Sequence, residues 1–265
     1  MTHPNVTPNV TLTTDFGLED HFVAVMKGVI LSICAKAQIT DISHSVRPFE
    51  IAQGAFLLAQ AWHYFPEGTI HVAVVDPGVG SARRPILVEA EGHFFVGPDN
   101  GVLALVYSPI SHQARLVSND AYFLKPVSTT FHGRDIFAPT AAHLAAGVPA
   151  NEFGRIIEDH LKPVWDTPQR TSKRSWTGAV LHVDRFGNLI TNFLQKEFPE
   201  LKQKPFEFSI GTRRLSEVAT SYAEMDSGAP FLIVGSSGYI EIAANRSRPP
   251  NFWVAAGPPC ELQLR

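Results

Sequence analysis

Short β-branched apolar runs alternate with longer amphipathic segments in the first half of the chain. Residues 10–14 lead into an Asp-Phe-Gly turn, and apolar residues then recur every three or four positions across 22–33. This spacing predicts a strand, a turn and a helix with one buried face. The alternation continues with a strand at 39–42, a helix at 51–62 and a strand at 70–75. Strands separated by helices predict an α/β domain with a central, mostly parallel sheet flanked by helices.

Two further strand-like runs change the pairing of this sheet. Residues 86–89 and 93–96 are separated only by Ala90-Glu91-Gly92. A connection this short favours a hairpin, so we expect the sheet to be mixed at this point. A helical pattern at 137–146 closes the region.

A polar stretch from Leu161 to Arg174 separates the two halves of the sequence. It contains two prolines and four basic residues, which is typical of an exposed connection between domains. We therefore predict an α/β domain at residues 1–165, a linker at 166–175 and a second domain at 176–265.

The second half contains short apolar runs between turns. These runs lie at 178–183, 189–192, 206–210, 231–234, 239–242 and 252–255. The step Gly211-Thr212 has the composition of a tight hairpin turn, and no segment shows a helical period of convincing length. This texture predicts an all-β, barrel-like domain.

Composition excludes several classes of protein. Hydrophobic residues make up 45% of the 265 residues and charged residues 18%, which is typical of a folded globular chain. The 22 basic and 25 acidic residues provide no broad cationic face, so nucleic acid is not expected as a partner. No apolar run is long enough to span a bilayer, and the N-terminus lacks a leader pattern, so we expect a cytoplasmic protein without a membrane partner. The two cysteines and the scattered histidines have no metal-ligand spacing, and no metal site is predicted.

Three polar loops follow predicted strands, where ligands of open α/β sheets collect: TTDFGLED, VVDPGVGSARR and STTFHGRD. Asp15 in the first loop can accept hydrogen bonds from a ribose diol, or it can be an ordinary turn former. Asp20 stands where a helix N-cap belongs. Asp76 precedes a turn with one proline and two glycines, which lets backbone approach a ligand.

The basic residues of these loops also have ordinary explanations. Arg83 and Arg84 are consistent with a solvated surface, and His132 with a packing or capping residue ahead of a helix. No dinucleotide fingerprint, phosphate loop or nucleophile elbow is present, so these motif-based enzyme classes are set aside.

Two turns of the second half carry polar residues. Asp184 and Asn188 flank a glycine turn in HVDRFGNLITN, and Ser236 and Ser237 lie in the turn of VGSSGYIEIAAN. Hairpin tips explain both, so this half by itself is consistent with an interaction or lid module.

Seven segments, in order, resemble the S-adenosylmethionine hydroxide adenosyltransferase family, the hydrolytic relatives of fluorinases and chlorinases. They are TTDFGLEDHFVAVMKGV, ITDISHSV, HVAVVDPGVGSARR, FVGPDNGVL, TFHGRDIFAP, VDRFGNLITN and GSSGYIEIAAN, and the resemblance extends over nearly the whole chain. The resemblance implies attack of water on C5′ of S-adenosylmethionine, with release of adenosine and methionine. It also implies a homotrimer with the ligand between the first domain of one subunit and the second domain of its neighbour. S-adenosylmethionine is then the substrate, and no cofactor is expected.

The resemblance also implies a role for individual residues. The water-activating trio would be Asp76, Arg83 and His132. The substrate-binding residues would be Asp15 for the ribose, Asp20 and Asp184 for the methionine ammonium, Asn188 for the adenine edge and Ser236 for the methionine carboxylate. Whether Asp76 or His132 accepts the proton is open at this point.

Two alternatives remain beside hydrolysis. Halogenating relatives have a tyrosine at the position of Asp76, a threonine at that of Val79 and an arginine at that of Ser237; none of these is found here. A halogenase would therefore lack its halide pocket. A protein that binds S-adenosylmethionine or adenosine with little turnover would need Asp15 and Asn188 but not the trio.

Overall fold

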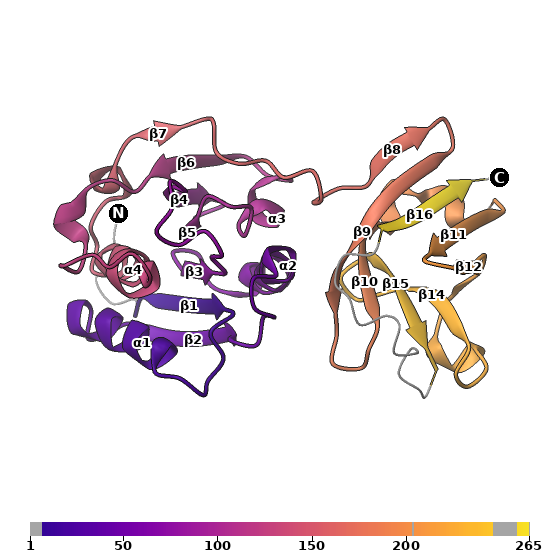
Figure 1. Cartoon of the computed structure of the whole chain (residues 1–265), viewed down its shortest axis with the longest axis horizontal. Coiled ribbons are helices and arrows are strands. Elements are labelled where there is room, and N and C mark those ends of the chain that lie inside the picture. The colour runs from indigo at the N-terminus through magenta and orange to yellow at the C-terminus, as the bar shows by residue number, and fades with distance from the viewer. Residues whose placement is uncertain (1–6, 203, 246–258, 265) are drawn as a thin grey trace. The chain divides into compact units, whose positions relative to one another are not determined.

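The structure is a computed structural model that describes residues 7–202, 204–245 and 259–264 (Figure 1). The chain divides into two compact units, residues 1–163 and 164–265. The strand predicted at 252–255 lies outside the described residues. None of the described helices is both long and apolar enough to cross a lipid bilayer.

The first unit is built on a seven-stranded sheet in the order β2-β1-β3-β5-β4-β6-β7. Its strands are β1 (Asn9–Thr14), β2 (Gln38–Ser43), β3 (Ile70–Val74), β4 (Pro85–Ala90), β5 (His93–Pro98), β6 (His112–Leu116) and β7 (Ile156–Ile157). β1 pairs in parallel with β2 and β3, and β3 with β5. β4 pairs antiparallel with both β5 and β6. The prediction of a mixed sheet is confirmed.

Helices cover both faces of this sheet (Figure 1). They are α1 (Phe22–Ile33), α2 (Ile51–Ala61), α3 (Ala104–Tyr107) and α4 (Ala138–Ala145). Because successive side chains of a strand point to opposite faces, Val10 and Leu12 of β1 lie in one core with residues of α1 and α4. α2 and α3 pack against each other on the other face. The layers leave the carboxyl ends of β1 and β3 at one edge of the sheet, where the polar loops begin.

The second unit is a curled nine-stranded sheet in the order β12-β11-β16-β9-β10-β15-β14-β13, with β8 paired to β9. Its strands are β8 (Gln169–Ser172), β9 (Ser175–Val183), β10 (Leu189–Leu194), β11 (Phe206–Ile210), β12 (Arg213–Leu215), β13 (Val218–Ala219), β14 (Pro230–Val234), β15 (Tyr239–Ala244) and β16 (Pro259–Leu264). In the described part of this unit every helix is a short 3-10 turn. The predicted fold class, an α/β unit followed by an all-β one, is confirmed.

Two local features of the second unit follow from its sequence, and one differs from the expectation. β11 and β12 form the hairpin expected at Gly211-Thr212. Alternate apolar residues such as Phe193, Phe208 and Leu262 fill the concave side of the sheet. Residues 169–172, which we assigned to a linker, form β8 instead, because hydrogen bonds to β9 order this polar segment.

Candidate active site

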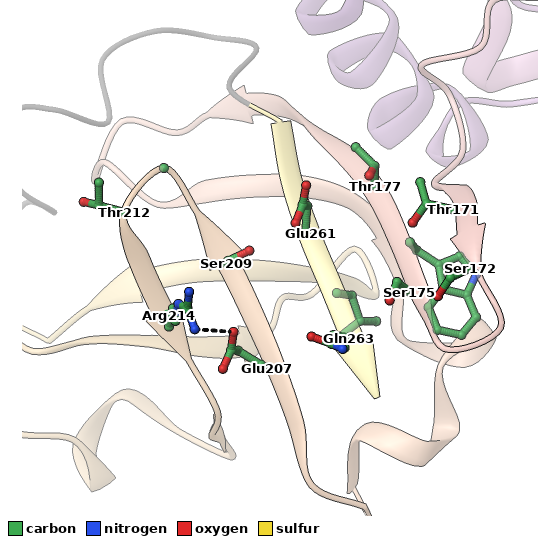
Figure 2. A pocket seen from close by; sticks show the side chains of 13 residues that line it. Thr171, Ser172, Ser175, Thr177, Glu207, Ser209, Thr212, Arg214, Glu261 and Gln263 are labelled. Atoms are coloured by element: carbon green, nitrogen blue, oxygen red, sulfur yellow. Dashed lines mark ion pairs between the residues drawn. The ribbon is translucent and has the colours of Figure 1, made fainter. Parts of the chain in front are cut away.

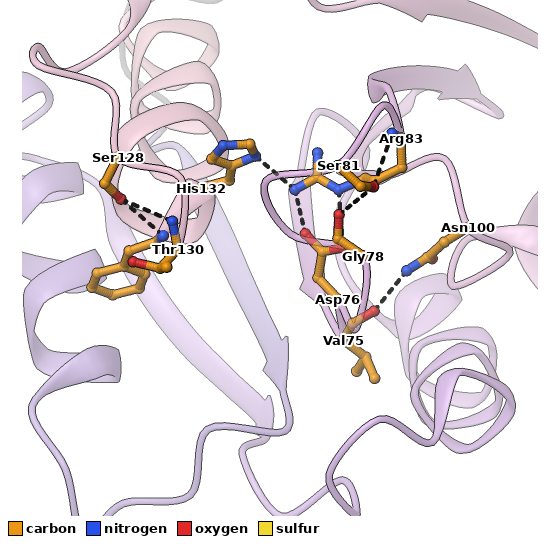
Figure 3. Close-up of polar contacts among 10 residues, drawn as sticks. Val75, Asp76, Gly78, Ser81, Arg83, Asn100, Ser128, Thr130 and His132 are labelled. Carbon is orange, nitrogen blue, oxygen red and sulfur yellow. Dashed lines mark hydrogen bonds and ion pairs between the residues drawn. The ribbon is translucent and has the colours of Figure 1, made fainter.

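An ion pair between Asp76 and Arg83 is the centre of the site (Figure 3). Asp76 follows β3, and Arg83 lies seven residues later on the same loop. The guanidinium donates from Nε to Asp76 Oδ1 over 2.9 Å and from Nη2 to Oδ2. The side chain of Arg83 is 9% exposed and that of Asp76 is 5% exposed. A buried pair with two parallel hydrogen bonds holds its geometry more firmly than a surface pair does.

His132 completes the cluster from a different loop. Arg83 Nη2 donates to His132 Nδ1 over 2.8 Å. Since a guanidinium has donors only, this ring nitrogen must be an acceptor, and the proton of the neutral imidazole lies on Nε2. Burial is the main cause that lowers the pKa of His132, and the positive charge of Arg83 lowers it further. The ring is therefore neutral at pH 7.

A close contact between the two loops brings the three side chains together. Gly80 has φ of 76°, and a Cβ there would lie 2.2 Å from the carbonyl oxygen of Thr129. Only glycine permits this approach. On the other side of the loop, the side chain of Asn100 donates to the carbonyl of Val75 over 2.8 Å, next to Asp76.

Hydrogen bonds also order the loop that carries His132. Ser128 Oγ accepts from the amide of Phe131 over 2.9 Å, and the carboxylate of the fully buried Asp135 accepts from the amide of Ser128 over 2.8 Å. His132 directly precedes a π-helical turn, Gly133–Phe137, that leads into α4. Such turns re-aim side chains and occur frequently at functional sites. The sequence pattern predicted a helix start here but not its π form.

One donor of the cluster has no partner within the described residues. Arg83 Nη1 is buried and takes part in no hydrogen bond there. The guanidinium carbon lies 5.1 Å from the centre of the Phe137 ring, so the group is fixed between an anion and an aromatic face. A buried, unpaired guanidinium nitrogen costs free energy unless a ligand or water accepts from it.

Asp15 lies near this cluster, at the end of β1. Its Oδ2 accepts from the backbone amide of Phe49 over 2.9 Å. Burial is the largest influence on the pKa of Asp15 and raises it, the Phe49 amide opposes the rise, and the negative charge of Asp76 adds to it. Phe49, which no sequence motif indicated, has a φ of 71° and is 69% exposed. Its unusual backbone has no local sequence signal.

The second unit has a polar cluster of its own. Asp184 Oδ1 accepts from the backbone amides of Phe186 and Asn188, each over 2.8 Å, and its Oδ2 accepts from the Asn188 side chain over 2.9 Å. The Asn188 amide also donates to the hydroxyl of Tyr222 over 3.1 Å. The bonds hold the β9–β10 turn, as the hairpin interpretation expects. They also gather several hydrogen-bond acceptor oxygens at this turn.

Glu241 is a further member of this cluster, and no sequence motif indicated it. This residue lies on β15 and is 9% exposed. Burial raises the pKa of Glu241 to about 7, and the charge of Asp184 contributes. A Cβ at Gly235 would lie 1.6 Å from Glu241 Oε1, so the space for this carboxyl depends on the glycine.

Three further residues, Asp20, Ser236 and Arg84, lie outside the two clusters. The structure corrects the local roles expected for Asp20 and Arg84. Asp20 does not cap a helix, because α1 begins at Phe22 with His21 at its N-cap position. Asp20 and Ser236 are both exposed. Arg84 is no free surface residue: its Nη2 donates to Asp99 over 2.6 Å and its Nη1 to Asp159 over 2.8 Å.

A polar groove of about 830 Å³ lies over β9, β11, β12 and β16 (Figure 2). An ion pair of 3.1 Å between Arg214 and Glu207 forms part of its wall. None of the predicted site residues lines it. Across the described ranges, no group of three or more potential ligands has the arrangement of a metal site.

The fold and the Asp–Arg–His cluster define an α/β protein with a buried site able to bind and polarise a small nucleophile. The S-adenosylmethionine hydroxide adenosyltransferase N-terminal domain matches residues 10–154, and the C-terminal domain of the same family matches residues 178–256. The chain belongs to this family.

Three relatives illustrate the range of similarity. The (R)-S-adenosyl-L-methionine hydrolase of Salinispora tropica is 37% identical over 247 residues, which cover 91% of this chain and 92% of that protein. A fluorinase of Actinoplanes sp. is 28% identical over 277 residues, with 91% and 92% covered. The crystal structure of an uncharacterised conserved protein from Thermotoga maritima superposes with a TM-score of 0.84 at 33% identity, covering 97% of this chain and all of that one.

Proposed function

We propose that this protein hydrolyses S-adenosyl-L-methionine to adenosine and L-methionine. The observation that carries the proposal is the buried Arg83 Nη1, a donor without a partner within the described residues, on the guanidinium whose Nε and Nη2 bind the carboxylate of Asp76. A water molecule at this donor would be polarised by the guanidinium, and the same guanidinium holds the carboxylate of Asp76, a candidate proton acceptor. The names of the hydrolase relatives support the substrate.

The reaction balances without an acid for the leaving group. The water oxygen forms a bond to C5′ while the C5′–sulfur bond breaks. The electron pair of the broken bond stays on sulfur and neutralises the sulfonium, so methionine leaves as a thioether. The proton of the water passes to the site. His132 Nδ1 accepts from Arg83, so the carboxylate of Asp76 is the acceptor that the geometry favours. For a hydroxide-like nucleophile, its negative charge and the positive charge of the sulfonium both fade toward the transition state, which a buried site favours over bulk water.

The binding roles that the resemblance implies are also part of the proposal. Asp15 would hold the ribose hydroxyls, and its position near Asp76 supports this role. Asp20 and Asp184 would face the methionine ammonium, Asn188 the adenine edge and Ser236 the methionine carboxylate. No cofactor is required by this chemistry.

The oligomeric state belongs to the proposal as well. We infer from the resemblance a homotrimer in which the residues of the first unit in one subunit and those of the second unit in its neighbour bind one substrate. Each unit then supplies part of the contacts: one the trio with Asp15, the other Asp184 with Asn188.

Water labelled with heavy oxygen tests the reaction. Purified protein is incubated with S-adenosylmethionine in this solvent, and adenosine is examined by mass spectrometry. We expect the label in the 5′-hydroxyl of adenosine. Unlabelled adenosine would contradict attack by water at C5′. Binding without any product would favour the binding-protein alternative, and a 5′-chloro or 5′-fluoro nucleoside in halide buffer would favour a halogenase.

A pair of matched variants tests the site. In Arg83→Lys the ammonium cannot contact both carboxylate oxygens and the water together, so we expect kcat to fall by about 10²-fold or more. Arg84→Lys makes the same substitution at the neighbouring arginine, whose partners are Asp99 and Asp159. It should keep kcat within a few-fold. Equal rates for Arg83→Lys and wild type would contradict the assignment.

A further inference from the structure

The turn that carries Asp15 is held by His44 at two points. The side-chain oxygen Oγ1 of Thr14 lies 2.8 Å from His44 Nδ1, and the carbonyl of His44 accepts from the amide of Gly17 over 2.8 Å. Thr14 Oγ1 also accepts from the amide of Phe16 over 3.3 Å. Contacts of His44 therefore bracket Asp15 on both sides of its backbone.

A carboxylate fixes the direction of these hydrogen bonds. Asp41 Oδ1 lies 3.0 Å from His44 Nε2, which makes no regular hydrogen bond within the described residues, and Asp41 Oδ2 accepts from Lys27 over 2.6 Å. A carboxylate can only accept, so in the neutral form of the imidazole the ring proton lies on Nε2. His44 Nδ1 is then an acceptor, and Thr14 must donate its hydroxyl proton to it. The lone pairs of Thr14 Oγ1 are left for the Phe16 amide.

Thr14, His44 and Asp41 have the residue types of a nucleophile, a base and an orienting acid. Thr14 is 0% exposed, however, and its hydroxyl is committed to His44. A hydroxyl that no substrate can reach cannot act as a nucleophile. The arrangement therefore acts on the backbone that it holds.

Asp15 needs such a restraint because its surroundings disfavour the ionised form of its carboxyl group. The carboxyl is half-buried, and the charge of Asp76 acts on it unfavourably. Without fixed neighbours, the turn would relieve both costs by rotating Asp15 toward solvent. Two contacts from His44 and one from the Phe49 amide oppose that movement.

We propose that Thr14, His44 and Asp41 form a positioning relay that orients the Asp15 carboxylate toward the two hydroxyls of a ribose. The inference rests on the proposed function, in which Asp15 binds the ribose. None of the three contacts the substrate; they act through Asp15. The relay thus contributes to recognition of a cis-diol and not to the chemistry at C5′.

The chain offers a matched control on the same strand. Thr13 is also 0% exposed, and its hydroxyl has no hydrogen-bond partner among the described residues. Thr13→Val and Thr14→Val each replace a hydroxyl by a methyl group at nearly constant shape. Only the second removes a donor of the relay, and Thr14→Ser restores that donor.

The experiment compares these variants on S-adenosylmethionine and on its 2′-deoxy analogue. We expect Thr14→Val to raise KM for S-adenosylmethionine on the order of five- to tenfold, with a smaller effect on kcat, because one oriented contact is lost. Thr14→Ser and Thr13→Val should stay within about twofold of wild type. With the 2′-deoxy analogue the Asp15–diol contact is already broken, so the KM values of Thr14→Val and wild type should converge.

A general loss of structure would affect both substrates equally, and that result would overturn the relay. So would a Thr14→Val variant that behaves like Thr13→Val. The wild-type assay reports on the proposed function alone. If wild type shows no turnover, calorimetry with adenosine and 2′-deoxyadenosine replaces KM: a selective loss of adenosine affinity in Thr14→Val supports the relay, and equal affinities overturn it.

Discussion

Arg83 orders the trio because its guanidinium can donate but never accept. It donates to two anionic oxygens of Asp76 and to one imidazole nitrogen of His132. This requirement assigns the proton of His132 to Nε2, and in the proposed reaction it leaves the Asp76 carboxylate as the base. A lysine could not impose the same assignment, since it is a point charge without a planar fork.

The protonation state of His132 predicts an acid limit for the activity. Burial and Arg83 hold the pKa of His132 below its usual 6.5. Protonation places a second N–H against the guanidinium and separates the pair. We expect kcat/KM to be constant above pH 6.5 and to fall with decreasing pH, by about tenfold per unit below the pKa.

The variant His132→Asn provides the control for this profile. Its amide oxygen can accept from Arg83 in place of Nδ1, but it does not titrate between pH 4 and 8. Activity should be reduced, and the acid limb should move away from the wild-type midpoint. An unchanged limb in this variant would assign the titration to another group.

The loops beyond β3 and ahead of α4 depend on each other through one glycine. The Gly80 backbone approaches the Thr129 carbonyl so closely that a methyl group cannot fit between them. Asp76 and Arg83 are on one loop and His132 is on the other, so this contact determines whether the trio assembles.

Gly80→Ala should therefore lower both stability and turnover. We expect a loss of at least about 2 kcal/mol in the free energy of unfolding, from strained backbone and a displaced loop. Gly147→Ala is the matched control: its φ is 95°, but nothing lies within 4 Å of the added Cβ. It should cost about 1 kcal/mol with normal kcat. Denaturant titration and product assays measure both, and equal effects of the two variants would contradict the loop-contact argument.

On β15, Glu241 makes the stability of the second unit depend on pH. Its pKa is about 7 in the folded chain, against 4.5 for an unperturbed glutamate. The folded carboxyl binds its proton more tightly than the unfolded one, so the free energy of unfolding falls as the pH rises from 4.5 to about 7.

Glu241→Gln should remove this dependence and raise stability at pH 8 by roughly 1 kcal/mol, once solvent screening is included. Glu261→Gln changes an exposed glutamate on β16 of the same sheet and should leave the slope as in wild type. Thermal unfolding across this pH range measures the slope. A Glu241→Gln slope equal to that of wild type would place the titration elsewhere.

For the whole chain, the proposed sharing of sites between subunits makes two inactive variants complement each other. Asp76→Asn disables the first unit, and Asn188→Ala disables the second. In trimers formed from an equal mixture, roughly a quarter of the sites combine an intact first unit with an intact second unit of the neighbour. Coexpression should therefore restore about that fraction of the wild-type rate.

Each variant alone sets the background of this experiment, and copurification of differently tagged chains verifies that mixed oligomers form. A mixture with mixed oligomers but no activity above that background would locate the whole site within one chain. Light scattering of the wild type reports the number of subunits independently.

Much of the first unit could be predicted because its elements follow from local patterns. Apolar residues at helical spacing and β-branched runs indicated α1, α2 and the first strands, and the short connection at 90–92 indicated the mixed pairing. β8 escaped prediction because its residues are polar and exposed, and only pairing with β9 makes them a strand.

The candidate site also contains residues that the sequence indicated and contacts that it did not. The family resemblance singled out Asp76, Arg83 and His132, and the structure places Asp76 and His132 each within hydrogen-bond distance of Arg83. Arg84 and Asp159, which are 75 residues apart, form an ion pair that no pattern near either residue indicates. Motifs locate candidate groups, whereas partners far along the chain depend on its path.

The sequence by itself determined the first alternating strands and helices, the division into an α/β and an all-β part, and the polar loops that carry candidate reactive groups, since periodicity and turn composition act over a few residues. Tertiary structure alone decided that His44 holds the turn of Asp15, that Gly235 leaves room for the Glu241 carboxyl, and that Gly80 meets Thr129. These contacts join distant segments. Their geometry depends on how whole layers pack, and local propensity carries no record of that packing.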